Sequence, residues 1–324
     1  MATPLLDVRG LTVRFRTERG ELTAVDDVSF SLEAGQTLAI VGESGSGKSV
    51  TAMSLMRLIP DPPGRITAGQ VLFEGQDLLQ LSESQMRAIR GDRIAMVFQE
   101  PMSSLNPSLT VGKQIAEPVN LHRGTAWKRA YLVARALLER VRIPDAGSRL
   151  QTYPHQYSGG MRQRVMIAMA LACQPKLIIA DEPTTALDVT VQAQILDLLK
   201  ELTRETGAAL ILITHDLGVV ARYADRVAVM YGGRVVEQAD AATLYARPQH
   251  PYTQGLLASI PRLDGEAGKR LVPIPGSPPD LARLPAGCAF APRCGRADAT
   301  CTASRPPLRA LPDHHLSACH HDAL

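Results

Sequence analysis

Residue types that bind phosphate occur together in one loop, Gly42-Glu-Ser-Gly-Ser-Gly-Lys48-Ser49. The loop fits the pattern G-x-x-x-x-G-K-[S/T], whose glycines let backbone N–H groups turn towards a phosphate chain. Lys48 supplies a positive charge for the outer phosphates, and the Ser49 hydroxyl can bind Mg²⁺. The alternative is a glycine–serine turn with an incidental lysine, which fits less well because a strand-like run precedes the loop and a helical run follows it. The sequence therefore predicts an ATP site here.

Two carboxylates, Asp181 and Glu182, follow the apolar run Leu177–Ala180. One carboxylate at a strand end can hold Mg²⁺, and a second can orient and deprotonate an attacking water. We expect Asp181 to bind the metal and Glu182 to act as the general base. The alternative, a strand that ends in two solvated acids, is weakened by the presence of the phosphate loop in the same chain.

A second candidate anion site is the segment Ser158-Gly159-Gly160, which precedes an apolar helical run. Ser158 is a predicted helix N-cap, and the glycines leave backbone donors accessible at the helix start. Because one chain needs only one nucleotide cradle, a second one suggests a site that another subunit completes.

These residues require a scaffold in which short apolar strands alternate with helices. Thr37–Val41 is a predicted strand, and a predicted helix begins at Lys48 and is ended by Pro60, Pro62 and Pro63. The pattern is helical from about Thr110 to Gln174, and a hairpin is expected over Arg226–Gln238. Alternating strands and helices predict an α/β fold with a mostly parallel sheet covered on both faces.

Composition narrows the class of protein further. The chain has 324 residues, of which 45% are apolar and 21% charged, as in an ordinary globular protein. The net charge of +3 is too small to indicate a nucleic-acid partner. No stretch approaches the ~18 apolar residues of a membrane span, and the N-terminus lacks the apolar segment of a signal peptide. We therefore expect a cytoplasmic protein that reaches a membrane only through a partner.

In their order, these motifs resemble those of the ATP-binding cassette (ABC) ATPases, over residues 5 to about 255. Further landmarks of that family are Gln99 after a strand, Ala186-Leu187-Asp188 after the acidic strand, and His215 after Leu210–Thr214. The resemblance implies a P-loop NTPase fold with an N-terminal antiparallel β subdomain and a helical signature subdomain at about 105–174. We expect an ATPase domain at 1–257 and a Pro/Cys-rich extension at 258–324, where ten of the 23 prolines lie.

The resemblance also implies roles for single residues. Gln99 contacts the metal or the water, Asp188 shapes the dimer contact, and His215 senses the γ-phosphate. Phe15 takes the place of an adenine-stacking aromatic, although a strand aromatic could equally belong to the core. The implied nucleotide-binding set is Phe15, Gly42, Ser44, Gly45, Ser46, Gly47, Lys48, Ser49, Val50, Gln99, Ser158, Gly159, Gly160, Asp181 and Asp188. Within it Mg²⁺ is assigned to Ser49, Gln99 and Asp181, and catalysis is assigned to Glu182, His215 and Gln99.

Several stretches resemble the dipeptide/oligopeptide importer branch of the family. They include Phe98-Gln-Glu-Pro-Met-Ser-Ser-Leu-Asn-Pro107, Pro183-Thr-Thr-Ala-Leu-Asp188 and His250-Pro-Tyr-Thr253. The resemblance implies the ATP-hydrolysing, energy-coupling subunit of a bacterial importer, with nickel, glutathione or oligosaccharide as alternative cargoes. A soluble cassette ATPase acting on DNA or ribosomes is a further alternative, but such proteins usually carry two cassettes and strongly basic arms. A regulatory protein that uses ATP binding as a switch is disfavoured by the presence of Glu182 and His215.

An importer subunit of this kind implies several partners. They are a second ABC ATPase subunit (a copy or a paralogue), two transmembrane permease subunits and an extracytoplasmic substrate-binding protein, with no nucleic acid. The segment from Gln99 to about Ala116 is expected to receive the permeases' coupling helices. The chain is then a peripheral protein on the cytoplasmic face of the inner membrane.

Four of the five cysteines lie near the C-terminus, at Cys288, Cys294, Cys301 and Cys319. Their spacing is not the paired C-x₂-C of a zinc ribbon, and four thiolates suit a [4Fe–4S] cluster. The extension also resembles the region that carries such a cluster in peptide-transporter ATPases. Zinc, helped by His320 or His314, and unpaired thiols are the alternatives. Cys173, within an apolar helical pattern, is expected to pack in the core.

Overall fold

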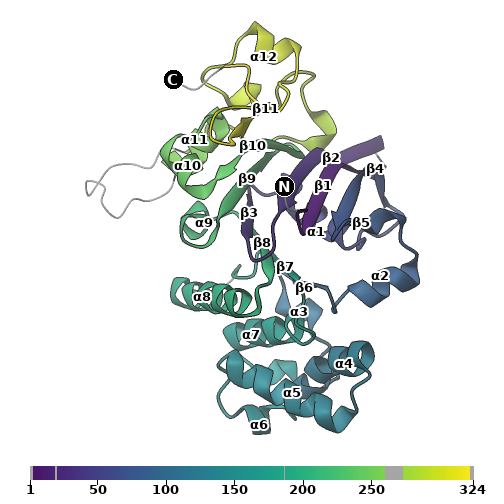
Figure 1. Cartoon of the computed structure of the whole chain (residues 1–324). Coiled ribbons are helices and arrows are strands. Elements are labelled where there is room, and N and C mark those ends of the chain that lie inside the picture. Colours follow the sequence, from purple (N-terminus) through teal and green to yellow (C-terminus); the bar gives the residue numbers. More distant parts are fainter. Residues whose placement is uncertain (1–2, 19, 186, 260–272, 322–324) are drawn as a thin grey trace. The chain divides into compact units, whose positions relative to one another are not determined.

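The computed structural model describes residues 3–18, 20–185, 187–259 and 273–321 (Figure 1). These residues form two compact units: unit 1 is Met1–Leu32, Thr37–Leu79 and Thr214–Leu324, and unit 2 is Glu33–Gln36 and Gln80–Ile213. Both units combine helices with strands, so the predicted α/β class is confirmed. Among the helices of the described residues, none has the length and apolarity that crossing a bilayer requires.

Unit 1 contains an antiparallel sheet with the strand order β2-β1-β4-β5. Its strands are β1 (Leu6–Thr17), β2 (Gly20–Leu32), β4 (Gly64–Phe73) and β5 (Gln76–Asp77). On β1, the side chains of Leu6, Val8, Leu11 and Val13 are buried. This sheet confirms the N-terminal antiparallel β subdomain that the family resemblance implies.

Further strands of unit 1 run in the order β11-β12-β10-β9-β3. They are β3 (Thr37–Val41), β9 (Arg226–Tyr231), β10 (Arg234–Asp240), β11 (Arg309–Ala310) and β12 (Leu316–Ser317). Strands β3 and β9 pair in parallel, and β9 and β10 form the predicted hairpin. Because β12 of the C-terminal extension pairs with β10, the extension continues this set of strands (Figure 1).

The helices of unit 1 are short. They are α1 (Lys48–Leu55), α9 (Leu217–Tyr223), α10 (Ala241–Ala246), α11 (Pro251–Ala258) and α12 (Ala299–Ala303), with 3₁₀ turns η1 (Leu78–Gln80), η3 (Leu281–Arg283) and η4 (Ala291–Arg293).

The end of α1 corrects one prediction. The helix ends at Leu55, well before Pro60, Pro62 and Pro63, so the prolines do not end it. Arg57 takes a left-handed conformation with φ 52°, and the N–H of Leu58 turns back to the carbonyl of Met53 at 2.9 Å. This backbone hydrogen bond closes the helix, as in a Schellman-type C-terminus.

The core of unit 1 includes residues of the extension. Phe290 packs edge-on against Tyr231, with ring centroids 5.2 Å apart, and also lies 5.4 Å from the ring of Tyr252. All three rings are buried in one apolar cluster with Val229 and Val236. Residues of the extension therefore share a core with β9, β10 and α11.

Unit 2 contains the parallel strands β6 (Ile94–Val97), β7 (Leu177–Asp181) and β8 (Ala209–Thr214), in that neighbour order. Figure 1 shows its helices α4 to α7 gathered below these strands. The helices are α2 (Glu83–Ile89), α3 (Pro101–Ser104), α4 (Val111–Arg123), α5 (Trp127–Arg140), α6 (Ala146–Arg149), α7 (Gly159–Ala170) and α8 (Val189–Thr206), with the 3₁₀ turn η2 (Pro154–Gln156). The predicted helical stretch from about Thr110 to Gln174 is thus broken into several segments.

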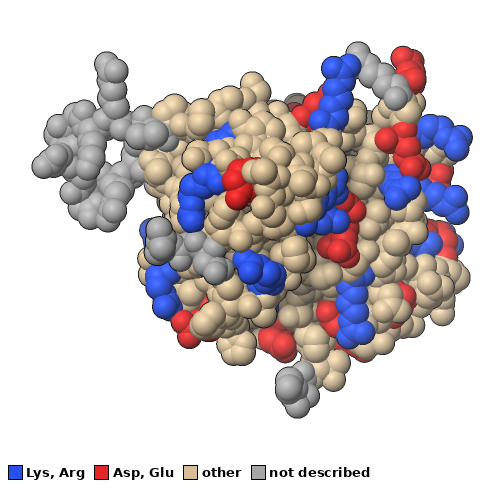
Figure 2. Space-filling view, turned by 90° about the horizontal axis from the view of Figure 1, so that it is seen from above, with Lys and Arg blue, Asp and Glu red and all other residues tan. Residues whose placement is uncertain are grey.

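Surface charges of both signs are mixed. On the face seen in Figure 2, Lys and Arg side chains lie among Asp and Glu side chains. Exposed ion pairs such as Arg14–Glu21 contribute to this mixture. Such pairs add little to stability, because water already solvates both charges.

Candidate functional site

The phosphate loop lies in unit 1, between β3 and α1, as predicted. Gly42 and Gly47 have φ of 153° and 99°, in the range that favours glycine. A Cβ on Gly47 would lie 2.5 Å from the carbonyl oxygen of Ala24, and one on Gly42 would collide with the carbonyl of Met230. The loop therefore needs glycine at both positions, because neighbouring backbone leaves no room for a side chain.

The polar groups of this loop suit an anion. The Lys48 ammonium is buried and donates to the carbonyls of Gly42 at 2.8 Å and Glu43 at 3.0 Å. The hydroxyl of Ser46 is also buried and has no hydrogen-bond partner among the described residues. A buried cation beside a buried hydroxyl without a partner fits the phosphate chain of ATP. Ser44 and Gly45 are exposed, and Ser49 and Val50 lie half-buried in the first turn of α1.

Phe15, the predicted adenine-stacking residue, lies on β1 beside β4. A Cβ on Gly64 would lie 2.6 Å from the Phe15 ring, so the ring packs directly on the glycine backbone. The Phe15 side chain is half-buried. Adenine stacking by Phe15 stays a prediction.

The acidic strand end lies in unit 2, and the structure brings two of the predicted residues together there. The Nε2 of Gln99 donates to Oε2 of Glu182 at 3.2 Å. Val97 of β6 pairs with Ala180 of β7, and this register places Gln99 near the residues that follow β7. Asp181, the last residue of β7, is buried.

A further residue holds Glu182, and the sequence reasoning missed it. The hydroxyl of Thr185 donates to the same Oε2 at 2.9 Å. Glu182 itself has φ 44°, a left-handed conformation that is uncommon for a residue with a Cβ. The spacing of three residues between Glu182 and Thr185 could have predicted this hydrogen bond. Short hydroxyl side chains at turns often form hydrogen bonds with a residue close in the sequence.

Two helix N-termini of unit 2 carry the other predicted residues. The hydroxyl of Ser158 caps α7 by accepting from the N–H of Met161 at 3.3 Å, so the predicted cap is confirmed. Asp188 caps α8 by accepting from the N–H of Val191 at 3.0 Å. The two helices touch at Gly160, where a Cβ would lie 2.8 Å from Val191 Cγ1. The landmark residue Ala186 lies outside the described residues.

His215 follows β8 directly and is exposed. The next residue, Asp216, caps α9 by accepting from the N–H groups of Gly218 and Val219. The loop, Phe15 and His215 belong to unit 1, whereas Gln99, Ser158–Gly160, Asp181, Glu182 and Asp188 belong to unit 2.

The C-terminal cysteines are gathered in unit 1. The N–H of Cys288 donates to the carbonyl of Cys301 at 2.7 Å, and the N–H of Arg296 donates to the sulfur of Cys294 at 3.4 Å. Burial raises the pKa of the Cys288 thiol, and the thiols of Cys301 and Cys319 raise it further. All four are free thiols in a half-buried or buried setting.

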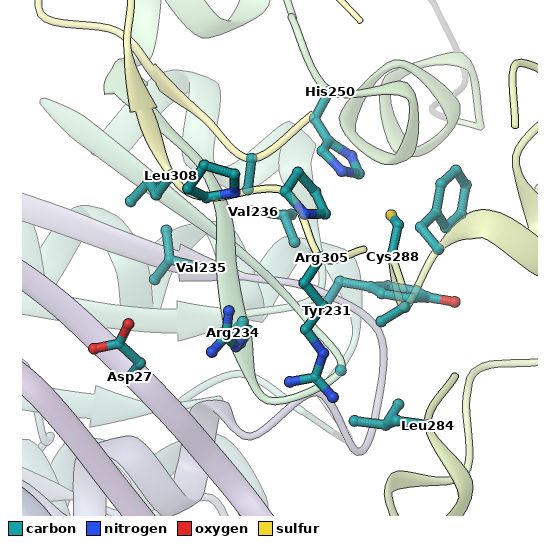
Figure 3. A pocket seen from close by; sticks show the side chains of 16 residues that line it. Asp27, Tyr231, Arg234, Val235, Val236, His250, Leu284, Cys288, Arg305 and Leu308 are labelled. Carbon is teal, nitrogen blue, oxygen red and sulfur yellow. The ribbon is translucent and has the colours of Figure 1, made fainter. Parts of the chain in front are cut away.

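A cavity of about 440 Å³ opens beside Cys288 (Figure 3). Tyr231, Val236 and His250 line it, as does Ala318, the neighbour of Cys319. Cys288 is the cysteine that lines this cavity. Thiols are the donor type that an iron–sulfur cluster requires.

The histidine near these thiols is not one of those expected. The Nε2 of His321 lies 3.5 Å from the Cys301 sulfur and 3.5 Å from a carboxylate oxygen of Asp298. His320 instead contacts the carbonyl of Ser304 at 2.9 Å. For a zinc site, the structure therefore favours Asp298, Cys301 and His321 over the predicted His320 or His314.

Cys173 packs in the core as expected, but its position along the chain differs from the prediction. It is buried, but it lies in the turn after α7 and not inside the helix. Burial raises the pKa of its thiol, which lowers its reactivity.

Comparison with known proteins agrees with this geometry. Residues 25–185 match the ABC transporter family, and residues 236–301 match the C-terminal region of oligopeptide/dipeptide transporters. The chain is 53% identical over 318 residues to the oligopeptide transport ATP-binding protein OppD of Salmonella typhimurium, covering 98% of this chain and 94% of that one. It is 53% identical over 315 residues to the dipeptide transport ATP-binding protein DppD of Bacillus subtilis, covering 97% and 94% of the two chains.

A solved structure is similar as well. The ATP-binding cassette MJ0796, determined as a dimer bound to ADP and phosphate, superposes with a TM-score of 0.66 and 29% identity, covering 73% of this chain and 98% of that one. The phosphate loop, the acidic strand end and the capped α7 thus occur in a chain that resembles such proteins over nearly its whole length. This chain belongs to the ATP-binding cassette family of transporter ATPases, and ATP hydrolysis is its reaction.

Proposed function

We propose that this ATPase is the energy-coupling subunit of a bacterial importer of dipeptides or oligopeptides. The observation that carries the proposal is the match of residues 236–301 to the C-terminal region of oligopeptide/dipeptide transporters. Relatives with 53% identity are named for oligopeptide and dipeptide transport, and their similarity extends through the extension. Phe290 of the extension packs in the same hydrophobic core as residues of β9, β10 and α11. This packing supports the view that the extension is an integral part of the subunit.

We assign roles in hydrolysis to residues of the phosphate loop and to residues at the acidic end of β7. Lys48 and the loop N–H groups hold the phosphates, and Ser49, Asp181 and Gln99 supply oxygen ligands for Mg²⁺. Bound Mg²⁺ would neutralise charge on the β- and γ-phosphates. Glu182 accepts a proton from the attacking water. Gln99 and Thr185 keep its carboxylate oriented for this purpose, through hydrogen bonds of 3.2 and 2.9 Å.

The second anion site implies a dimer. Ser158, Gly159 and Gly160 lie at the N-terminus of α7, where backbone N–H groups and the helix dipole favour an anion. We assign these residues to the γ-phosphate held by a second cassette, a copy or a paralogue, with Asp188 shaping the contact and His215 sensing the γ-phosphate. The cassette similar to this chain, MJ0796, is itself a dimer.

The membrane partners would dock on the segment from Gln99 to about Ala116. Met102 within this segment and Phe98 directly before it expose large apolar side chains, at 60% and 39%. Exposed apolar groups of this kind favour a protein contact. We place the subunit on the cytoplasmic face of the membrane, bound to two permease subunits that receive cargo from a binding protein.

We further propose that Cys288, Cys294, Cys301 and Cys319 hold a [4Fe–4S] cluster with a structural role. The extension has few regular elements, and metal–thiolate bonds would cross-link it. The cluster itself supplies redox-capable iron, but no electron transfer is required for transport.

Transport by the complete complex tests the cargo. The chain is reconstituted in liposomes with its partner cassette, its permease subunits and its binding protein, and uptake of labelled dipeptides is measured with internal ATP. We expect ATP-dependent uptake that unlabelled di- and oligopeptides compete with. Uptake of nickel, glutathione or an oligosaccharide instead of peptide would overturn the cargo assignment.

A further inference from the structure

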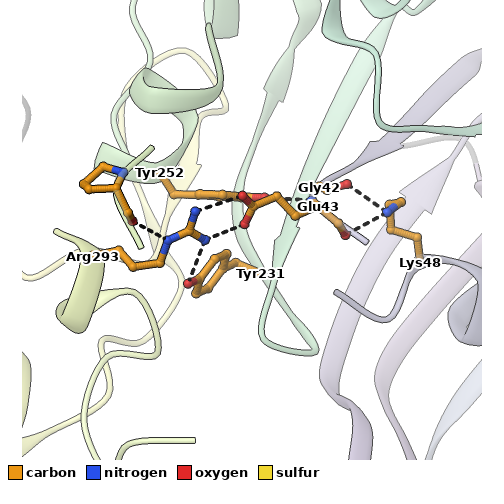
Figure 4. A network of polar contacts seen from close by, with 7 residues as sticks. Gly42, Glu43, Lys48, Tyr231, Tyr252 and Arg293 are labelled. Atoms are coloured by element: carbon orange, nitrogen blue, oxygen red, sulfur yellow. Dashed lines mark hydrogen bonds and ion pairs between the residues drawn. The ribbon is translucent and has the colours of Figure 1, made fainter. Parts of the chain in front are cut away.

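The extension reaches the phosphate loop through one ion pair, between Arg293 of η4 and Glu43 (Figure 4). The contact is bidentate: Nη1 lies 2.5 Å from Oε2 and Nη2 lies 2.9 Å from Oε1. The Arg293 side chain is only 6% exposed, and the Glu43 side chain is 24% exposed. Paired, shielded geometry of this type gives the stronger class of ionic hydrogen bond.

Arg293 is held in one orientation by its surroundings. Its Nε donates to the carbonyl of Pro275 at 2.9 Å, and its Nη1 also donates to the Tyr231 hydroxyl at 3.3 Å. The guanidinium carbon lies 5.9 Å from the Tyr231 ring centre and 6.0 Å from that of Phe290. These contacts hold the guanidinium in one orientation.

The backbone of Glu43 forms several further hydrogen bonds. Its N–H donates to the Tyr252 hydroxyl at 2.8 Å, and its carbonyl accepts from the Lys48 ammonium at 3.0 Å and from the N–H of Ser46 at 3.2 Å. Tyr252 belongs to α11, so two parts of the chain outside the loop hold this one residue. A movement of Glu43 would move the support on which Lys48 rests.

We propose that Arg293 is a positioning residue for nucleotide binding, through which the C-terminal extension sets the phosphate loop. Arg293 does two things: it fixes Glu43, and it neutralises a carboxylate that would otherwise repel the phosphates of ATP. Neither effect depends on the cargo or on a metal at the cysteines. The inference therefore rests only on the ATPase activity.

Binding of a fluorescent ATP analogue with Mg²⁺ to the purified full chain tests the proposal. We expect Arg293→Gln to weaken binding about tenfold, because it leaves the Glu43 carboxylate unpaired beside the loop. In the transport complex, the KM for ATP should rise by a similar factor while kcat changes little. Arg247→Gln is the matched control, since it breaks an arginine–carboxylate pair with Asp313 of the extension whose partner is not in the loop.

A second substitution separates positioning from a general loss of stability. Glu43→Gln/Arg293→Gln removes the unpaired charge and should recover most of the affinity lost in Arg293→Gln. A purely structural role predicts the reverse, since the double variant loses more contacts. The melting temperature without nucleotide shows whether each variant is folded.

Unchanged affinity in folded Arg293→Gln, or an equal loss in Arg247→Gln, would overturn the proposal. If Arg293→Gln does not fold, Arg293→Lys decides. It keeps the charge but not the bidentate contact, and we expect an affinity between those of the wild type and about a tenfold loss. Wild-type affinity in a folded Arg293→Lys, with Glu43→Gln also unchanged, would then count against positioning.

Discussion

Glu182, the proposed general base, is held in a defined orientation by its neighbours. Its backbone is left-handed at φ 44°, which costs energy for a residue with a side chain, and its N–H is bonded to the carbonyl of Ile213 at 3.0 Å. Gln99 and Thr185 both donate to the same carboxylate oxygen, Oε2, so two hydrogen bonds hold the side chain in one orientation. Such an arrangement orients a general base.

We expect Glu182→Gln to bind ATP with little change but to lower the hydrolysis rate at least about 100-fold, because an amide cannot accept the proton of the attacking water. Phosphate release and retained nucleotide are the two measurements. Glu201→Gln is the control: Glu201 is an exposed residue of α8 in the same unit, paired with Arg142. Hydrolysis at the wild-type rate in Glu182→Gln would refute the assigned role.

At the scale of elements, the packing of α7 on α8 depends on Gly160. Gly159 has space beside it, since a Cβ there would lie 3.5 Å from Leu187, whereas a Cβ on Gly160 would lie 2.8 Å from Val191. Val191 is β-branched and cannot easily rotate away. The two adjacent glycines thus meet different constraints.

We predict opposite stability effects for the two glycines. Gly160→Ala should lower the free energy of unfolding by about 1 kcal/mol through overpacking. Gly159→Ala should leave it unchanged or raise it by up to about 1 kcal/mol, because alanine favours the helix. Denaturant unfolding of the full chain measures both. Adding Val191→Ala should restore the loss in Gly160→Ala; no restoration would show that the clash is not the cause.

His250, at the N-terminus of α11, should make the stability of the protein depend on pH. It caps this helix, accepting from the N–H of Tyr252 at 3.1 Å, and it is 1% exposed. Burial lowers its pKa from 6.5 to about 4, although the nearby Glu237 carboxylate acts in the opposite direction. The folded state therefore keeps His250 neutral, while the unfolded chain takes up a proton below pH 6.5.

Stability should consequently fall as the pH drops from 6.5 towards 4. Between pH 7 and pH 5 we expect this group to remove about 2 kcal/mol from the free energy of unfolding. In His250→Asn the side chain can still cap the helix but does not titrate, so that part of the slope should vanish. Denaturation curves at several pH values check this, and identical slopes in the two proteins would contradict it.

At the scale of the whole molecule, the extension is integrated with the cassette. It pairs a strand with β10, places Phe290 in the core of unit 1, and grips the loop through Arg293. A change in the structure of the extension around Arg293 should therefore alter the affinity for ATP.

The cysteine proposal makes such a change testable. Protein purified without air should be brown and contain iron and sulfide. Removing the iron with a chelator should lower the melting temperature, because the metal–thiolate bonds would no longer cross-link the extension. Cys301→Ser should lose the iron, whereas Cys173→Ala, a control far along the chain, should keep it. Colourless protein with stoichiometric zinc would instead indicate a site around Asp298, Cys301 and His321.

Features that depend on residues close together in the sequence were predictable from the sequence alone. The phosphate loop, the Ser158 cap, the order of the motifs and the α/β class depend on neighbouring residues and on periodicity, and all of these could be predicted. Contacts between distant residues could not. The pairing of Arg293 with Glu43 across 250 positions, the hydrogen bond from Gln99 to Glu182, and the approach of His321 to Cys301 arise only when strands and turns pack together. The residue types of the loop Gly42–Ser49 are enough to predict phosphate binding, whereas the residues that hold the loop in place become evident only once the chain has folded.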